Sequence, residues 1–217
     1  MKVLRIHRED FLVIKEIFQK EKMEQFLFIL AEKIRITAGL VIYLVKEVII
    51  PEEKDMRIHQ SALVEPEMSA QLMVYKSAKD NGYAIFDLHN HWFQQNPGFS
   101  SIDLGSAHKN GKFITKYIPG VDFGLMVFNG EVNAYSGRMF NKDKSDFEPL
   151  DAIEIIGSPL ELLFSDEAKN QHPQDEKYSR HCLIPGWQQN VLPDLKVAVI
   201  GAGGNGSLII QALACLG

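Results

Sequence analysis

Three features are scarce in this sequence of 217 residues, and each scarcity excludes a class of protein. It holds 2 cysteines, Cys182 and Cys215, too few for the disulfide framework of a small secreted domain. The longest apolar runs, at residues 26–31 and 40–45, are far shorter than the about 20 residues that a membrane-spanning helix needs. Charged residues near the N-terminus interrupt the apolar stretch that a signal peptide requires. We therefore predict a cytoplasmic protein.

Positive charge is also limited. Lysine and arginine number 23 against 28 aspartates and glutamates, and the formal net charge is -5. The basic residues are scattered, which argues against binding to nucleic acids or to anionic membranes. Hydrophobic residues make up 46% of the chain, an ordinary value for a globular protein. The length allows one large domain, or one domain and a piece of another.

Hydrophobic periodicity predicts an α/β (α+β) fold for residues 1–164. The expected helices cover residues 8–20 and 67–79, with a further helix opening at residues 100–107. The expected strands cover residues 3–6, 25–37, 40–50, 83–88, 122–128, 131–135 and 152–156. The second and third strands should form a hairpin, and an Asn129-Gly130 turn should join the fifth to the sixth.

The composition changes after residue 164. Residues 165–177 are polar and contain proline, so we interpret them as a linker to a second segment at residues 178–217. There, residues 196–200 have the pattern of a buried strand, a glycine-rich turn follows, and residues 207–216 have the pattern of a helix. This order predicts one βα unit. A single βα unit has no sheet to cover its apolar faces, so we expect the chain to be part of a longer protein.

A metal site is predicted from two histidines and a carboxylate. His89 and His91 stand at positions i and i+2 after a buried strand, so both imidazoles point to one face. Asp103 follows a turn and can return as an oxygen ligand. Two histidines and one carboxylate leave a coordination position for water, which is typical of catalytic rather than structural zinc sites. His108 is the one further histidine that we consider as a spare ligand.

Two more residues are candidates for the chemistry of this site. Ser100 stands three residues before Asp103, so its hydroxyl can reach the same volume. Glu24 immediately precedes an apolar strand and can act as the general base. Spacing alone does not select Glu24 as the base. The competing carboxylates are those of Glu32, Glu47 and Glu52.

Together these segments resemble a known motif. Glu24 at a strand start, His89-Asn-His91 and Ser100-Ser-Ile-Asp103 look like the JAMM motif of JAB/MPN metalloproteases. The resemblance covers about residues 1–160 and implies an MPN-like mixed β-sheet flanked by helices. It also implies that Zn2+ is bound by both histidines and Asp103, that Glu24 transfers protons and that Ser100 stabilises the oxyanion.

The chain departs from the family's pattern at two points. Trp92 stands where the family has proline after the second histidine, and the spacing from His91 to Asp103 is one residue longer than usual. The extra residue falls in a loop at residues 93–99, which can accommodate it. Degenerate, metal-free MPN domains generally lose the histidine pair or the aspartate. This chain keeps all of them.

The glycine-rich turn has a chemistry of its own. Gly201, Gly203, Gly204 and Gly206 lie between a predicted strand and a predicted helix, where glycines allow backbone N–H groups to approach a phosphate. This context makes the motif meaningful, because an isolated glycine pattern of this kind is weak. The pattern does not separate NAD from ATP.

The residues upstream of the glycines narrow the choice of nucleotide. Tyr178-Ser-Arg180-His, Leu183-Ile-Pro-Gly186 and the glycine turn resemble the start of ThiF/MoeB-like ubiquitin-activating domains, with Asn205 in place of the usual leucine. The resemblance implies ATP and Mg2+ binding in a complete domain, with Arg180 reaching a nucleotide across a homodimer. The rest of such a domain lies beyond Gly217. The simpler alternative is a terminal strand and helix that dock on the first domain.

These resemblances lead to three functional hypotheses. The first is a zinc-dependent (iso)peptidase that processes or deconjugates a ubiquitin-like protein and is fused to an activating (adenylating) domain. The second is a non-catalytic MPN-type module that binds the ubiquitin-like partner for that domain. The third is a metal hydrolase that acts on small amides or sulfur-carrier precursors. Metal content separates the second from the other two.

Overall fold

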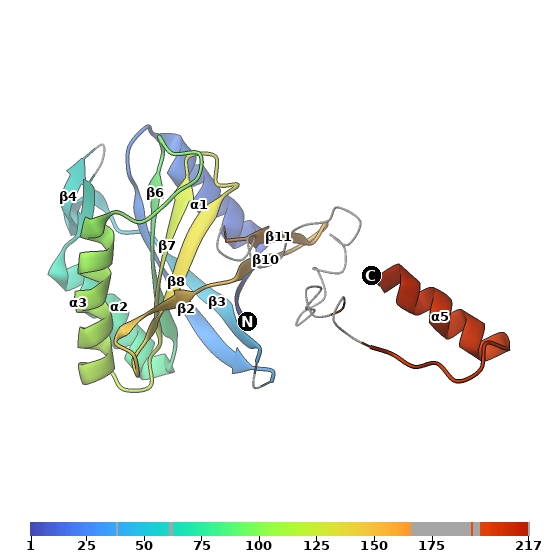
Figure 1. Ribbon diagram of the computed structural model, residues 1–217. Coiled ribbons are helices and arrows are strands. Elements are labelled where there is room, and N and C mark those ends of the chain that lie inside the picture. Colours follow the sequence, from blue (N-terminus) through green and yellow to red (C-terminus); the bar gives the residue numbers. More distant parts are fainter. Residues whose placement is uncertain (38, 61–62, 166–191, 193–195, 217) are drawn as a thin grey trace. The chain divides into compact units, whose positions relative to one another are not determined.

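The computed structural model describes residues 1–37, 39–60, 63–165, 192 and 196–216 (Figure 1). The chain divides into two compact units, Met1–Ala168 and Lys169–Gly217. The first unit contains every strand found among the described residues. None of the helices in the described ranges is long and apolar enough to cross a membrane.

The first unit is built on a mixed nine-stranded sheet with the order β11-β10-β1-β3-β2-β6-β7-β8-β9. Its strands are β1 (Lys2–His7), β2 (Phe26–Arg35), β3 (Val41–Ile49), β6 (Ala84–His91), β7 (Phe123–Asn129), β8 (Tyr135–Asn141), β9 (Asp146–Pro149), β10 (Ala152–Ile156) and β11 (Glu161–Phe164). Strand β6 pairs antiparallel with β2 and parallel with β7, near the middle of the sheet. A separate two-stranded sheet pairs β4 (Met56–Gln60) with β5 (Leu63–Pro66), after the short 3-10 helix η1 (Glu53–Asp55).

Helices cover both faces of the large sheet (Figure 1). Helix α1 (Arg8–Lys20) buries Phe11, Ile14 and Phe18 in one core, which also holds Phe86 and Leu88 of β6. Helices α2 (Met68–Asn81) and α3 (Ser101–Tyr117) enclose the other core, which holds Ile85 of β6. Because side chains alternate along a strand, β6 supplies both cores and is buried along its whole length.

The coarse prediction of a mixed α/β (α+β) domain is confirmed. Helix α1 and strand β10 have the predicted bounds, and β2 and β3 form the predicted antiparallel hairpin. Helix α3 continues well beyond residue 107 because Ile114 and its neighbours pack into the core. Strands β4, β5, β9 and β11 were not predicted from the sequence.

One predicted strand, at residues 131–135, is wrong. Strand β8 begins only at Tyr135, and a loop precedes it. The side-chain oxygen of Asn129 accepts hydrogen bonds from the backbone N–H groups of Asn133 and Ala134, at 3.0 and 3.1 Å. These bonds close a loop that is longer than the predicted two-residue turn.

The second unit contains helix α5 (Gly204–Leu216), which agrees with the predicted helix. The predicted strand at residues 196–200 is wrong, because this segment is irregular and Val197 is 59% exposed. A strand needs a neighbour for its N–H and C=O groups, and the described part of this unit contains no strand with which to pair.

Of the predicted linker, only Ser165 is described. Arg180 and the motif at residues 178–186 lie outside the described residues.

Two glycines of α3 provide a test of its packing. A Cβ atom on Gly111 would lie 2.5 Å from Cδ2 of the rigid Phe140 ring, whereas a Cβ on Gly105 meets nothing within 4 Å. Gly111→Ala should therefore lower the free energy of unfolding by about 1–3 kcal/mol through overpacking. Gly105→Ala should raise it by about 0.5–1 kcal/mol because alanine favours the helix. Urea unfolding of both variants checks this, and equal gains would show that Phe140 moves aside at no cost.

Candidate metal centre

Strand β6 brings two imidazoles to one face of the sheet. Asp87, His89 and His91 alternate with core residues, so all three point to the face covered by α2 and α3. Both histidines are buried, at 7% and 4% exposure. The predicted strand ended at residue 88, but β6 extends through His91 and holds both ligands on regular backbone.

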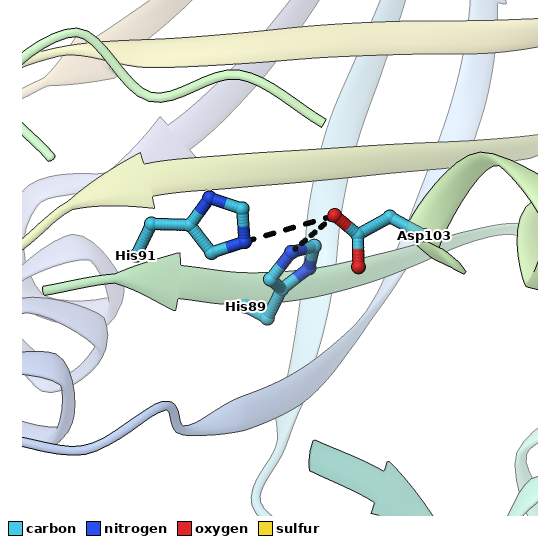
Figure 2. Close-up of side chains that lie close together, drawn as sticks. All are labelled: His89, His91 and Asp103. Atoms are coloured by element: carbon cyan, nitrogen blue, oxygen red, sulfur yellow. Dashed lines mark ion pairs between the residues drawn. The ribbon is translucent and has the colours of Figure 1, made fainter. Parts of the chain in front are cut away.

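The helix α3 supplies the carboxylate at its first turn. Ser100 is the N-cap: its Oγ accepts the backbone N–H of Asp103 at 3.1 Å, and Asp103 Oδ2 accepts the backbone N–H of Ser100 at 2.6 Å. This reciprocal capping box fixes the Asp103 side chain. Its Oδ2 lies 3.6 Å from Nε2 of His89 and 3.6 Å from Nε2 of His91. Figure 2 shows both imidazoles facing that one oxygen.

The donor set fits a metal ion. His89, His91 and Asp103 each offer one ligand atom, and these three atoms all lie within 4.8 Å of one another. The buried Nε2 of His89 has no hydrogen-bond partner among the described residues, and such a nitrogen is costly unless something binds it. Two imidazole nitrogens and a carboxylate oxygen are ligands that zinc accepts. These residues can therefore hold a metal ion, and zinc is compatible with them.

Glu24 lies beside this group, as predicted. Its side chain is buried, and Oε1 lies 3.7 Å from Nε2 of His91. The fully buried Asn90 holds the chain next to Glu24, because its Oδ1 accepts the backbone N–H of Gln25 at 2.7 Å. Asn90 also donates to the carbonyl oxygen of Phe18 at 3.2 Å. Asn90 was not among the predicted site residues, although it stands between the two histidines.

The environment adjusts the pKa values of the group. Burial raises the pKa of Glu24, the charge of Asp103 raises it further, and His89 opposes both. Burial and the neighbouring His89 lower the pKa of His91, which favours the neutral imidazole that a metal requires. Burial alone would raise the pKa of Asp103, but the close approach and charge of His89, together with the hydrogen bonds with Ser100, lower it to about 2.

A cavity of about 570 Å³ opens at the metal group. Glu24, His89, His91, Ser100 and Asp103 all line it, so the predicted residues are brought together in one place. Its lining also includes two residues that the sequence analysis missed, Asp87 and Asn110. Burial raises the pKa of Asp87 to about 7, against the hydrogen bond from Asn110 and the charge of His89.

The alternative residues lie elsewhere. Glu32 pairs with Lys46 at 3.3 Å and Glu52 with Lys54 at 2.8 Å, both near the surface, and Glu47 is exposed on β3. None of these three carboxylates lines the cavity. His108 packs its ring against Phe147, with centroids 4.9 Å apart, and is not part of the metal group. Among the weighed carboxylates, Glu24 is the one at the metal group.

The glycine-rich turn belongs to the second unit. Gly201 has a φ of +91°, and a Cβ on Gly206 would collide with the carbonyl oxygen of Gly201, so both positions require glycine. Helix α5 begins at Gly204, and the N–H of Ser207 donates to the carbonyl oxygen of Gly203 at 2.8 Å. The turn is therefore tight and leads directly into a helix N-terminus.

Comparison with protein-family models gives no match, and comparison with curated proteins gives none either. Among solved structures, the chain is similar to a solution structure of a protein from Desulfitobacterium hafniense. The two are 14% identical, the match covers 75% of this chain and 94% of the other, and the TM-score is 0.42. These values assign no function to the chain.

Proposed function

We propose that the chain is a zinc-dependent (iso)peptidase that processes or deconjugates a ubiquitin-like protein. The observation that carries the proposal is the position of Glu24. This carboxylate comes from a segment far from the histidines in sequence, yet it is buried and lies 3.7 Å from His91. Three residues that can hold a metal ion, with a buried carboxylate beside them, form an arrangement suited to metal-assisted hydrolysis of an amide. The resemblance to the JAMM motif supports the same reading.

Each residue has a role in this proposal. His89, His91 and Asp103 hold the ion. Zinc in such a site supplies Lewis acidity, which polarises a scissile carbonyl and makes water acidic enough to react near neutral pH. Glu24 takes a proton from the water and passes it to the leaving amine. Because Ser100 Oγ accepts the N–H of Asp103, its own O–H group is free to donate to the oxyanion.

The surroundings of the cavity suit a macromolecular substrate. Large apolar side chains stand exposed near it: Phe93 is 54% exposed, Ile102 61% and Phe113 39%, and all three line the cavity. Exposed apolar groups around a polar centre are typical of protein-binding surfaces. The class of partner, a ubiquitin-like protein, rests on the resemblance. So does the proposal that an ATP-dependent, dimeric activating domain, with Arg180 and the glycine turn at its start, completes the protein.

The proposal is tested with a ubiquitin-like protein whose C-terminal tail is fused to a reporter. The zinc-loaded chain should release the reporter at the end of the tail, a chelator should stop the release, and added zinc should restore it. A metal-free chain that binds the fusion without cutting it would support the non-catalytic module. Cleavage of small amides without cleavage of the fusion would support the small-amide hydrolase.

A further inference from the structure

The cavity at the metal group has a second polar feature on the same strand. Asp87 is 9% exposed and stands two residues before His89 on the same face of β6. Its Oδ2 accepts a hydrogen bond from the Nδ2 group of Asn110 at 3.2 Å. Its buried Oδ1 has no hydrogen-bond partner among the described residues. Asp87 lines the cavity, and one of its two carboxylate oxygens has no partner among the described protein groups.

The neighbours of Asp87 leave its Oδ1 without a hydrogen-bond partner. Phe28 and Leu125 are its partners on the adjacent strands, and Tyr75, Ala107 and Leu125 belong to the surrounding core. Tyr75 donates its hydroxyl to Gln71 rather than to Asp87. No described cation forms an ion pair with Asp87. A buried carboxylate with an unused oxygen destabilises a fold, so a position of this kind is more typical of a binding site than of a core.

We propose that this part of the cavity is a specificity subsite for a substrate side chain with an apolar stem and a cationic nitrogen at its end, of the lysine or arginine type. The nitrogen donates to Asp87 Oδ1, Asn110 holds the other oxygen, and Tyr75, Ala107 and Leu125 contact the stem. A carboxylate rather than a neutral acceptor favours a cation over an alcohol. Apolar walls with a single charge at the base suit a long side chain whose polar group is at its tip.

The position of the subsite relates it to the scissile bond. Two residues along a strand span about 7 Å, which is about the length of an extended lysine side chain. A side chain whose nitrogen reaches Asp87 therefore has its backbone close to the metal group. This inference rests on the proposed peptidase function, because it places the recognised residue next to the bond that is cut.

Binding to the metal-free chain tests the subsite without catalysis. The probes are n-butylammonium and n-butylguanidinium, with n-pentanol as the neutral control, followed by the NMR shifts of the Asn110 side-chain amide. The two cations should bind saturably, and Asp87→Asn should weaken them by about tenfold or more, as expected for a lost charged hydrogen bond. Glu32→Gln, which removes a carboxylate outside the cavity, should not weaken them, and this separates the loss of a contact in the subsite from a general loss of negative charge. Equal binding by wild type and Asp87→Asn, or by n-pentanol and the cations, would overturn the proposal.

Melting temperatures separate recognition from a structural role. If Asp87 serves binding, Asp87→Leu should raise the melting temperature of the metal-free chain by a few degrees, because an unpaired buried carboxylate is removed. A lower melting temperature in both Asp87→Leu and Asp87→Asn would assign Asp87 to the fold instead and contradict the subsite.

Cleavage of reporter peptides that vary beside the scissile bond gives a separate result for the proposed activity. A preference for lysine or arginine that Asp87→Asn removes supports both proposals. Cleavage with no such preference retains the peptidase and rejects the subsite. Absence of cleavage, with the cation binding intact, rejects the peptidase and retains the subsite.

Discussion

Replacing His89 by alanine should reduce bound zinc from about one ion per chain to a small fraction of that, because a mononuclear site with three protein ligands loses one of them. The two that remain, His91 and Asp103, offer one nitrogen and one oxygen. Zinc is measured by elemental analysis after dialysis against a zinc buffer. Cleavage of the fusion substrate should fall with the zinc content.

Other histidines provide matched controls for this result. His7 is exposed and lies outside the cavity, so His7→Ala should keep its zinc. His108, the spare ligand considered from the sequence, packs against Phe147, so His108→Ala should also keep zinc even if it melts earlier. Full zinc content in His89→Ala would contradict the assignment of His89 as a zinc ligand. Loss of zinc in His108→Ala, with an unchanged melting temperature, would identify His108 as a zinc ligand.

Glu24→Gln should keep the zinc and lose the chemistry. The amide retains the size of the side chain but cannot accept and deliver a proton, so kcat should fall by about 10²–10⁴-fold, the usual contribution of a general base. The control is Glu32→Gln, because Glu32 pairs with Lys46 outside the cavity and should leave kcat unchanged. Equal kcat values for wild type and Glu24→Gln would remove Glu24 from the mechanism.

The stability of the metal-free chain gives an independent check on Glu24. Burial raises its pKa above the ordinary value of 4.5, so the folded state favours the neutral carboxyl group. The unfolded state ionises first as the pH rises, and the folded state is therefore stabilised below pH 4.5 and progressively destabilised above it, until the raised pKa is passed. Glu24→Gln removes this pH-dependent loss of stability, because the amide does not ionise. The metal-free variant should melt no earlier than wild type near pH 8, and an earlier melt would show that Glu24 stabilises the fold.

The histidine pair could be predicted from sequence because it depends on one strand. Alternation places His89 and His91 on one face wherever a strand runs through them, and no other element is needed. The position of Glu24 next to the histidines depends on the pairing of two strands. In β2 and β6, Phe26 lies opposite His89, and this register continues outward to bring Glu24 level with His91. Register between strands distant in sequence is set by tertiary packing, so only the motif pointed to Glu24.

The missed residues show the same limit. Asp87 stood within a predicted buried strand, and the alternation that selected the histidines also places it on their face. Its partner Asn110 could not be predicted. The predicted helix ended at residue 107, and the contact between Asp87 and Asn110 joins residues that are 23 positions apart. The strand predicted at residues 196–200 is the reverse case, an element that was predicted but is not formed. Its composition is that of a strand, but a strand also needs a neighbour to pair with.

The large sheet ends on both sides in its shortest strands, β9 and β11, with four residues each. Strand β9 carries Asp146, Glu148 and Pro149, and β11 begins with Glu161. Short edges with charges and a proline offer few free N–H and C=O groups to the sheet of another molecule, which opposes edge-to-edge aggregation. In the first unit, self-association through the large sheet is therefore disfavoured. The exposed apolar groups around the metal cavity are the surface that the proposed ubiquitin-like partner would contact.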